Sequence, residues 1–330
     1  MKLIKKIIYW KLSLQFYLIT FLRNKLYDFG LLKSYSFDIP IISVGNLTVG
    51  GTGKTPMVEF LINHFSKEYK IGVLSRGYKR KSKGFILASK IDDANSIGDE
   101  PFQYYSKFKN ISVAVDKNRR RGINKLIEHG VNLIILDDAF QHRKVIPTYS
   151  LLLSDYSNLY FNDYLLPRGS LRESKKGSKR ADSVVITKCP ENFSQSDKNY
   201  LIDRVKLSSN QHIFFSKIKY SEELYSSSDT LNIMKLSNKK VNVVTGIVNS
   251  EVLISFLKDK NINVEHFKYP DHFDYKEKDI LKFRDNITIT TEKDYSKLRK
   301  FNIENLYYLP ISVDIAEEKI FIETIRDQII

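Results

Sequence analysis

The sequence has 330 residues but only one cysteine, Cys189. A single cysteine cannot form an intramolecular disulfide, which favours a buried, unpaired thiol in a reducing compartment. The sequence also lacks an uninterrupted apolar run of the roughly 20 residues that a membrane-spanning helix needs. With 42% hydrophobic and 28% charged residues, it is not collagen-like, mostly disordered or a polytopic membrane protein. Its length predicts two domains of ordinary size.

Acidic residues are scarce relative to basic ones. The 53 lysines and arginines outnumber the 38 aspartates and glutamates, so the formal net charge is +15. Three segments, residues 1–33, 78–83 and 168–180, together carry a net charge equal to this whole excess. Nucleic acid, anionic lipid and phosphorylated small molecules would all suit such a charge. The chain has no recognisable nucleic-acid-binding module, so nucleic acid is the least favoured of the three.

Residues 1–33 are basic and rich in aromatic side chains. The apolar run from Leu12 to Leu22 is about half the length that spans a bilayer, and no small-residue cleavage site of a secretory signal follows it. The segment therefore predicts an amphipathic helix. Such a helix either lies in a membrane interface, with lysines at anionic headgroups, or packs on its own domain as a core helix. The sequence leaves both interpretations open.

Short apolar runs alternate with helical patterns from Ile39 onward. We expect strands at residues 39–44, 71–74, 111–115, 133–136, 150–153 and 184–187, and helices at residues 56–65, 100–108 and 119–129. Continuously apolar strands separated by helices predict an α/β fold, with a parallel sheet covered by helices on both faces.

The domain organisation predicted from these patterns has four parts. They are an N-terminal helix (1–33), a first α/β domain (34–190), a linker region around one strand (191–240) and a second, smaller α/β domain (241–330). The final helix, expected over Ala316–Ile330, is a candidate to pack back on the first domain.

A glycine-rich loop joins the first expected strand to the first expected helix. Its residues are Thr48, Val49, Gly50, Gly51, Thr52, Gly53, Lys54 and Thr55. This is the context of a P-loop, in which backbone N–H groups face phosphate oxygens, the lysine reaches the β- and γ-phosphates and the hydroxyl binds Mg²⁺. Thr48 replaces the usual leading glycine, and Pro56 suits the first position of a helix. The chain is therefore predicted to have a P-loop NTPase-like fold.

A carboxylate for the metal ion is expected at the end of another buried strand, where Asp137 and Asp138 follow Leu133–Leu136. At that edge of the sheet a carboxylate faces Mg²⁺ held by Thr55. The segment 185–190 resembles a guanine-reading lysine loop but lacks the aspartate that follows such a lysine. ATP is therefore the predicted nucleotide, with Mg²⁺ as its metal.

Two classes of protein share this P-loop, and the residues separate them. Partitioning ATPases have a second lysine immediately before the Gly-Gly pair, where this chain has Val49. The chain instead resembles the bacterial lipid A 4'-kinase (tetraacyldisaccharide 4'-kinase) family. The similarity lies in blocks that occur in order over most of the chain: Val44–Pro56, Leu74–Tyr78, Gly98–Pro101, Leu136–Arg143, Leu166–Glu173, Asp271–Phe273 and Thr291–Asp294.

The resemblance implies an activity and a location. Members of this family transfer the γ-phosphate of ATP to the 4'-hydroxyl of an acylated glucosamine disaccharide 1-phosphate, which yields lipid IVA. It also implies two α/β/α domains with the substrate between them, at the cytosolic face of the bacterial inner membrane. The N-terminal helix would then be a peripheral or monotopic contact with an anionic membrane surface, and no obligate protein partner is evident.

The resemblance also implies catalytic residues. Asp99 is the expected base, paired with His272, and Lys54 contacts the transferred phosphate. The alternative for Asp99 is an N-cap of the following helix. Thr55, Glu100, Asp137 and Asp138 are candidate Mg²⁺ ligands.

Candidate substrate ligands are mainly arginines, because a guanidinium matches a phosphate group. They are Arg76, Arg119, Arg120, Arg168 and Arg172, together with Gln141 and His142. The rival functional class is a membrane-associated regulatory or transport ATPase. Such a protein hydrolyses ATP without phosphorylating a lipid.

Overall fold

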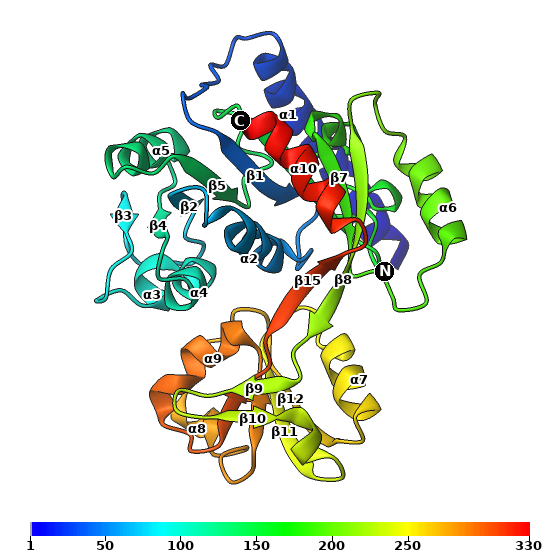
Figure 1. Cartoon of the computed structure of the whole chain (residues 1–330). Helices are drawn as coiled ribbons and strands as arrows, with labels where there is room; N and C mark the ends of the chain where they lie inside the picture. Colours follow the sequence, from blue (N-terminus) through cyan, green and yellow to red (C-terminus); the bar gives the residue numbers. More distant parts are fainter. Residues whose placement is uncertain (1) are drawn as a thin grey trace.

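A computed structural model describes residues 2–330 as two lobes joined by two strands (Figure 1). The larger lobe contains a nine-stranded sheet with the order β15-β8-β7-β6-β1-β5-β2-β4-β3. Its strands are β1 (Ile41–Asn46), β2 (Ile71–Ser75), β3 (Ile86–Leu87), β4 (Ser112–Val115), β5 (Leu133–Asp137), β6 (Tyr149–Asp155), β7 (Ser183–Thr187), β8 (His212–Tyr220) and β15 (Ile311–Ile315). Apart from the edge strands β3 and β15, neighbouring strands pair in parallel. The predicted parallel sheet is confirmed.

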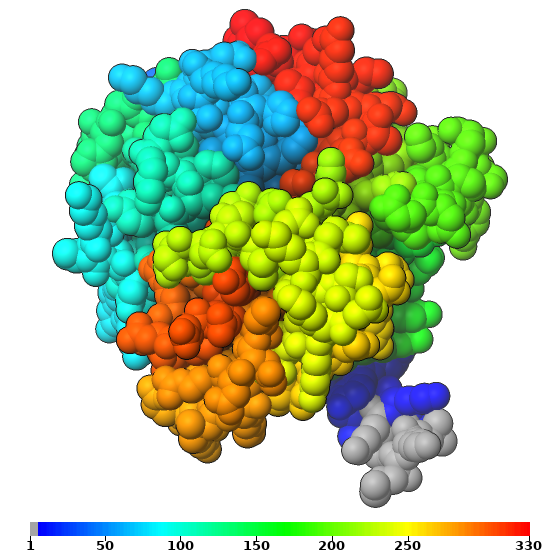
Figure 2. Space-filling model, turned by 60° about the horizontal axis from the view of Figure 1, so that its bottom comes forward, coloured from blue at the N-terminus to red at the C-terminus, as the bar shows by residue number. Residues whose placement is uncertain are grey.

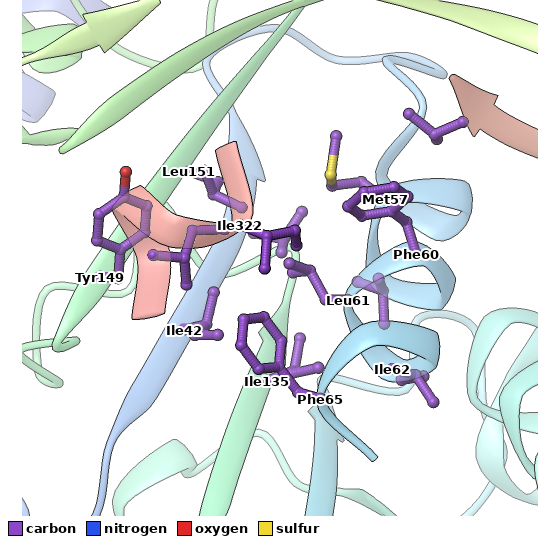
Figure 3. Close-up of a cluster of buried hydrophobic side chains, with 14 of the residues drawn as sticks. Ile42, Met57, Phe60, Leu61, Ile62, Phe65, Ile135, Tyr149, Leu151 and Ile322 are labelled. Atoms are coloured by element: carbon purple, nitrogen blue, oxygen red, sulfur yellow. The ribbon is translucent and has the colours of Figure 1, made fainter. Parts of the chain in front are cut away.

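Helices cover both faces of this sheet. The helices of this lobe are α1 (Lys2–Asp28), α2 (Lys54–Phe65), α3 (Ala94–Ile97), α4 (Asp99–Lys107), α5 (Arg119–Glu128), α6 (Gln195–Val205) and α10 (Glu318–Ile329), with short 3₁₀ turns η1 (Tyr160–Asn162) and η2 (Lys175–Arg180). Side chains of a strand point alternately to opposite faces. Accordingly, Ile42 packs with α2 and α10 on one face (Figure 3), whereas Ile41 packs with α5 on the other. This two-sided burial explains why the strands are continuously apolar.

The smaller lobe contains a six-stranded sheet with the order β10-β9-β14-β13-β11-β12. Its elements are β9 (Glu223–Tyr225), β10 (Thr230–Asn232), η3 (Ile233–Leu236), β11 (Lys240–Thr245), α7 (Glu251–Asp259), β12 (Asn263–Lys268), α8 (Glu277–Ile280), β13 (Thr288–Thr290), α9 (Glu292–Leu298), η4 (Arg299–Phe301) and β14 (Leu306–Tyr308). The β11, β12, β13 and β14 strands pair in parallel. In Figure 1, α9 lies at the edge of this lobe that faces the larger one.

The residues at which the two lobes begin and end differ from the domain boundaries expected from the sequence. Residues 191–240 were expected to be a linker region, but they contain α6, β8, β9, β10 and η3. The chain crosses between the lobes along β8 and returns along β15, which pairs antiparallel with it, so β15 and α10 belong to the larger lobe. Hydrophobic patterning shows where a strand lies, but it does not show which sheet the strand joins, because that depends on pairing with distant segments.

The helix α1 contacts the larger lobe through polar groups and through the buried Tyr27. The Ser13 hydroxyl donates to the carbonyl of Leu165 (3.0 Å), and the Asn24 amide donates to Glu173 (2.9 Å). Most of its apolar side chains are exposed: Ile7, Ile8, Tyr9, Trp10, Leu12, Leu14, Leu18, Ile19, Phe21 and Leu22. Figure 2 shows the N-terminal part of α1, in blue, projecting from the edge of the molecule. Among the described residues, no helix has the length and apolarity needed to cross a bilayer.

Candidate active site

The glycine-rich loop lies between the end of β1 and the start of α2. Gly50 (φ +117°) and Gly53 (φ +84°) adopt backbone conformations that residues with a Cβ rarely reach, so glycine is needed at both positions. The helix begins at Lys54, two residues before the predicted start, and Pro56 is its third residue. The proline still costs no hydrogen bond, because the N–H groups of the first helical turn have no partner within the helix.

Neighbouring loops hold this loop from outside. The Thr187 hydroxyl donates to the carbonyl of Thr52 (2.9 Å), and the Val49 N–H donates to the carbonyl of Ser170 (2.8 Å). The Lys188 ammonium donates to the carbonyl of Gly51 and pairs with Asp155 (2.7 Å). These contacts fix the loop before any ligand binds. Sequence reasoning missed the role of Lys188, although its position directly after a buried strand is where such contacts arise.

Lys54 faces a network of charged and polar groups. Its ammonium nitrogen lies 3.7 Å from Asp138 and 3.3 Å from the Asn46 side-chain oxygen. Arg172 holds Asp138 through two hydrogen bonds (2.8 and 3.1 Å) and also donates to Asn46. Against the cost of desolvation, the charges of Lys54 and Arg172 lower the pKa of Asp138 to about 2. Asp138 is therefore an anion at neutral pH.

The neighbouring carboxylate, Asp137, has the opposite character. It ends β5 directly beside Val44 of β1, and it is buried. Burial and the nearby charges of Asp138 and Glu100 raise the pKa of Asp137 to about 7. Carboxylates crowded in this way favour binding of a cation, which neutralises them.

The donor set fits Mg²⁺ rather than a metal held entirely by protein. Within residues 2–330, no group of three or more His, Cys, Asp or Glu side chains forms a preformed metal site. Mg²⁺ usually takes only one or two carboxylates and completes its shell with substrate phosphates and water. Thr55 with Asp137, Asp138 or Glu100 would provide such a partial set.

Asp99 and His272 meet across the two lobes. The His272 Nδ1 atom lies 2.8 Å from an Asp99 carboxylate oxygen, and the Lys297 ammonium lies 2.6 Å from the same oxygen. Gly98 is the N-cap of α4 and Asp99 is its first residue, so the N-cap interpretation of Asp99 is wrong. Burial alone would raise the pKa of Asp99, but hydrogen bonds from His272 and Lys297 outweigh it and hold the pKa below its ordinary value.

The other ring nitrogen of His272 faces a lysine. Lys293 Nζ lies 3.1 Å from His272 Nε2 and 2.8 Å from Asp271. An ammonium group only donates, so Nε2 accepts and Nδ1 carries the proton that is shared with Asp99. His272 itself has φ +59°, an uncommon conformation for a residue with a side chain, and its backbone N–H donates to the carbonyl of Gly246 (3.3 Å). The surrounding structure thus fixes both the ring and its tautomer.

One residue connects the two halves of the site. Glu100 is close enough to Asp137 to raise its pKa, and its carboxylate lies 3.8 Å from His272 Nε2 and 3.7 Å from Lys293. The carboxylates beside the P-loop and the Asp99–His272 pair therefore belong to a single site between the lobes.

Sequence reasoning missed Lys293 and Lys297 as site residues. They lie four positions apart at the start and end of α9, which places them on the same face of that helix. Lys293 belongs to the motif Thr291–Asp294. Lys297 could have been found from its helical spacing, because it lies four residues after Lys293.

The candidate substrate ligands occupy different places. The Gln141 amide donates to the carbonyl of Asn46 (2.9 Å) and Arg172 contacts Asp138, so both lie beside the P-loop. Arg119 is buried and donates to the carbonyls of Asp116 and Asp137. Arg76 is exposed at the end of β2. The remaining two arginines lie over aromatic rings, Arg120 over the half-buried Tyr35 and Arg168 over the exposed Tyr164.

His142 lines a basic pocket between α1 and the larger lobe. The cavity has a volume of about 400 Å³ and is lined by Arg23, Tyr27, Lys117, Asn118, His142 and Lys144. Burial, together with the positive charges of Arg119, Arg23, Lys144 and Arg76, lowers the pKa of His142 to about 4. A pocket whose own charges suppress protonation of a histidine favours an anionic ligand.

A phosphate-binding loop, converging carboxylates and an Asp–His pair between two lobes define the protein as a P-loop phosphotransferase. The family model described as tetraacyldisaccharide-1-P 4'-kinase (LpxK) matches residues 5–330. The chain belongs to this family.

Individual relatives agree with this assignment. The chain is 46% identical over 313 residues to the tetraacyldisaccharide 4'-kinase of Flavobacterium psychrophilum, covering 92% of this chain and 91% of the relative. It is 39% identical to the enzyme of the same name from Bacteroides thetaiotaomicron, covering 90% and 86%. The crystal structure of Aquifex aeolicus LpxK in complex with ATP superposes with a TM-score of 0.79 at 30% identity, covering 97% of this chain and 98% of that one.

The position of Lys297 predicts a change in the pH profile. Replacing it (Lys297→Met) removes a hydrogen bond and a positive charge from Asp99, so the pKa of Asp99 rises. Asp99 is the expected base, and a base must be unprotonated to act, so the acid limb of kcat/KM is expected to move to higher pH. Lys300→Met, which alters an exposed lysine two residues beyond α9, is expected to leave the profile unchanged. An unshifted acid limb in Lys297→Met would contradict this account of Asp99.

Proposed function

We propose that the protein transfers the γ-phosphate of ATP to the 4'-hydroxyl of a tetraacyl glucosamine disaccharide 1-phosphate. The observation that carries this proposal is the Asp99–His272 pair, which Glu100 connects to the carboxylates beside the P-loop. A protein that uses ATP only as a conformational switch needs no base for an alcohol. Membership of the 4'-kinase family supplies the substrate.

Each part of the site has a role in this reaction. Residues 48–55 bind the ATP phosphates through backbone N–H groups, and Lys54 neutralises charge on the transferred group. Mg²⁺, held by Thr55 and the carboxylates Asp137, Asp138 or Glu100, would neutralise charge on the phosphates. Arg172 keeps Asp138 ionised and correctly oriented.

Asp99 accepts the proton of the attacking hydroxyl. Its lowered pKa keeps it ionised at neutral pH, and His272 holds the carboxylate in place through the Nδ1 proton. After transfer, Asp99 holds the proton and releases it to water, because Nδ1 of His272 already carries a proton and cannot accept a second one.

The reaction is tested with purified protein, γ-labelled ATP, Mg²⁺ and disaccharide 1-phosphate in detergent micelles. Label is expected in the lipid. Lys54→Ala is expected to abolish turnover, and Asp99→Ala to lower kcat by about 10²- to 10⁴-fold with little change in ATP affinity. Label found only as free phosphate would support the regulatory or transport ATPase instead, and a normal kcat in Asp99→Ala would remove Asp99 as the base.

We propose that the basic pocket binds the phosphate already present on the acceptor. Three of its cations, Arg23, Lys117 and Lys144, make no ion pair with a carboxylate in the described part of the chain. Lys117→Gln is therefore expected to raise KM for the disaccharide 1-phosphate while KM for ATP stays constant. Lys90→Gln, at an exposed lysine outside the pocket, is the control. An unchanged acceptor KM in Lys117→Gln would rule out this role.

We also propose that α1 places the enzyme on the cytosolic face of the inner membrane. Most of its apolar side chains are exposed while Ser13 and Asn24 contact the lobe, which suits insertion into a lipid interface rather than packing as a core helix. The basic residues of 1–33 would add attraction to anionic headgroups.

Charged substitutions in α1 test this placement. Leu18→Glu with Ile19→Glu is expected to reduce binding to vesicles that contain anionic lipid, because both side chains are more than half exposed on α1 (55% and 67%) and a carboxylate resists transfer into the acyl region. The control is Ile320→Glu, at a similarly exposed isoleucine (54%) of α10. Equal vesicle binding by the two proteins would refute the interfacial placement.

A further inference from the structure

Lys107 stands between two carboxylates that come from different lobes. Its ammonium group lies 2.7 Å from Glu59 of α2 and 2.9 Å from Glu292 of α9. The Gln103 amide also donates to Glu59 (2.8 Å). Glu59 and Glu292 have side chains only 5% and 11% exposed, whereas that of Lys107 is 32% exposed. Burial and the charge of Glu59 raise the pKa of Glu292, so the lysine offsets an unfavourable pair of carboxylates.

The contact has a defined relation to the Asp99–His272 pair. Asp99, Gln103 and Lys107 are spaced four residues apart, so they share one face of α4. Asp99 begins α4 and meets Lys297 near the end of α9, whereas Lys107 ends α4 and meets Glu292 at the start of α9. The two helices therefore run antiparallel, with an ion pair at each end. The separation along α4 is about 12 Å.

The two ion pairs together fix how α9 lies on α4. A single ion pair allows one helix to pivot or slide on the other, but two at opposite ends oppose both movements. The residues whose placement depends on this alignment are Lys297, which contacts Asp99, and Lys293, which lies 3.7 Å from Glu100. Glu59 is five residues after Lys54 on α2, so the contact also ties α9 to the helix that follows the P-loop.

We propose that Lys107 is a positioning residue that aligns the smaller lobe on the larger one, so that His272 and Lys297 meet Asp99. Lys107 does not touch the reacting groups in this scheme. It acts through α9, by bridging Glu59 and Glu292.

Kinetics of three variants test the proposal, and this part rests on the proposed kinase activity. Lys107→Met is expected to lower kcat about tenfold to a hundredfold, since small misplacements of catalytic groups have effects of this size, while KM for ATP stays within about twofold. Lys107→Arg is expected to keep most of the activity, because a guanidinium can bridge two carboxylates. Lys109→Met, at a lysine whose ammonium lies over the Tyr105 ring, is the matched control and is expected to match the starting protein.

The double variant Lys107→Met with Glu292→Gln separates alignment from charge balance. It removes the lysine together with one of the two opposed carboxylates, so little electrostatic cost remains. If Lys107 aligns the lobes, kcat stays low in the double variant although its thermal stability recovers. Recovery of kcat to the level of the starting protein would overturn the proposal, because Lys107 would then only neutralise Glu292.

A distance measurement supplies a readout that does not need activity. Nitroxide labels on Lys67→Cys and Glu304→Cys, both at exposed positions of different lobes, report the spacing by pulsed electron paramagnetic resonance. The native Cys189 is buried and stays unlabelled. Lys107→Met is expected to broaden or shift the distance distribution, and Lys107→Arg to leave it unchanged. An unchanged distribution in Lys107→Met would overturn the proposal, whereas absence of lipid phosphorylation in the starting protein would count only against the proposed function.

Discussion

A carboxylate on one lobe and an imidazole on the other must stay within hydrogen-bonding distance for this site to exist. The 2.8 Å contact between Asp99 and His272 depends on the antiparallel alignment of α4 and α9. That alignment depends in turn on the strands β8 and β15, which carry the chain between the lobes. The ion pairs at the two ends of α4 complete the arrangement. The relative position of the two lobes therefore decides whether Asp99 and His272 can meet.

The protein has one region of crowded negative charge and one of crowded positive charge, and each favours a ligand of the opposite sign. Beside the P-loop, burial and like charges raise the pKa of Asp137 to about 7, which favours a bound cation. In the basic pocket, burial and neighbouring cations lower the pKa of His142 to about 4, which favours a bound anion. An enzyme that brings Mg²⁺ and ATP to a phosphorylated acceptor requires both conditions. Part of the excess of basic residues noted in the composition lies in α1, which contributes Arg23 to this pocket.

The helix α1 shows why composition alone left two interpretations open. Its apolar residues would suit either a protein core or a lipid interface, because both environments reward removal of apolar surface from water. The structure places polar side chains such as Ser13 and Asn24 against the larger lobe and leaves Leu18 and Ile19 exposed. The apolar face of α1 points away from the larger lobe, and this orientation favours a lipid interface over a protein core.

The sequence by itself determined the parallel sheet and the form of the P-loop, because these depend on residues adjacent in the chain. Glycines with positive φ at 50 and 53 and a lysine at the start of α2 are local requirements. Only the tertiary structure decided that β8 and β15 join the larger sheet and that Lys297 and Lys107 secure α9. It also brought Asp99 to His272, 173 residues away. The physical reason is that such contacts depend on how distant segments pair and how the two lobes pack together, which local patterns do not encode.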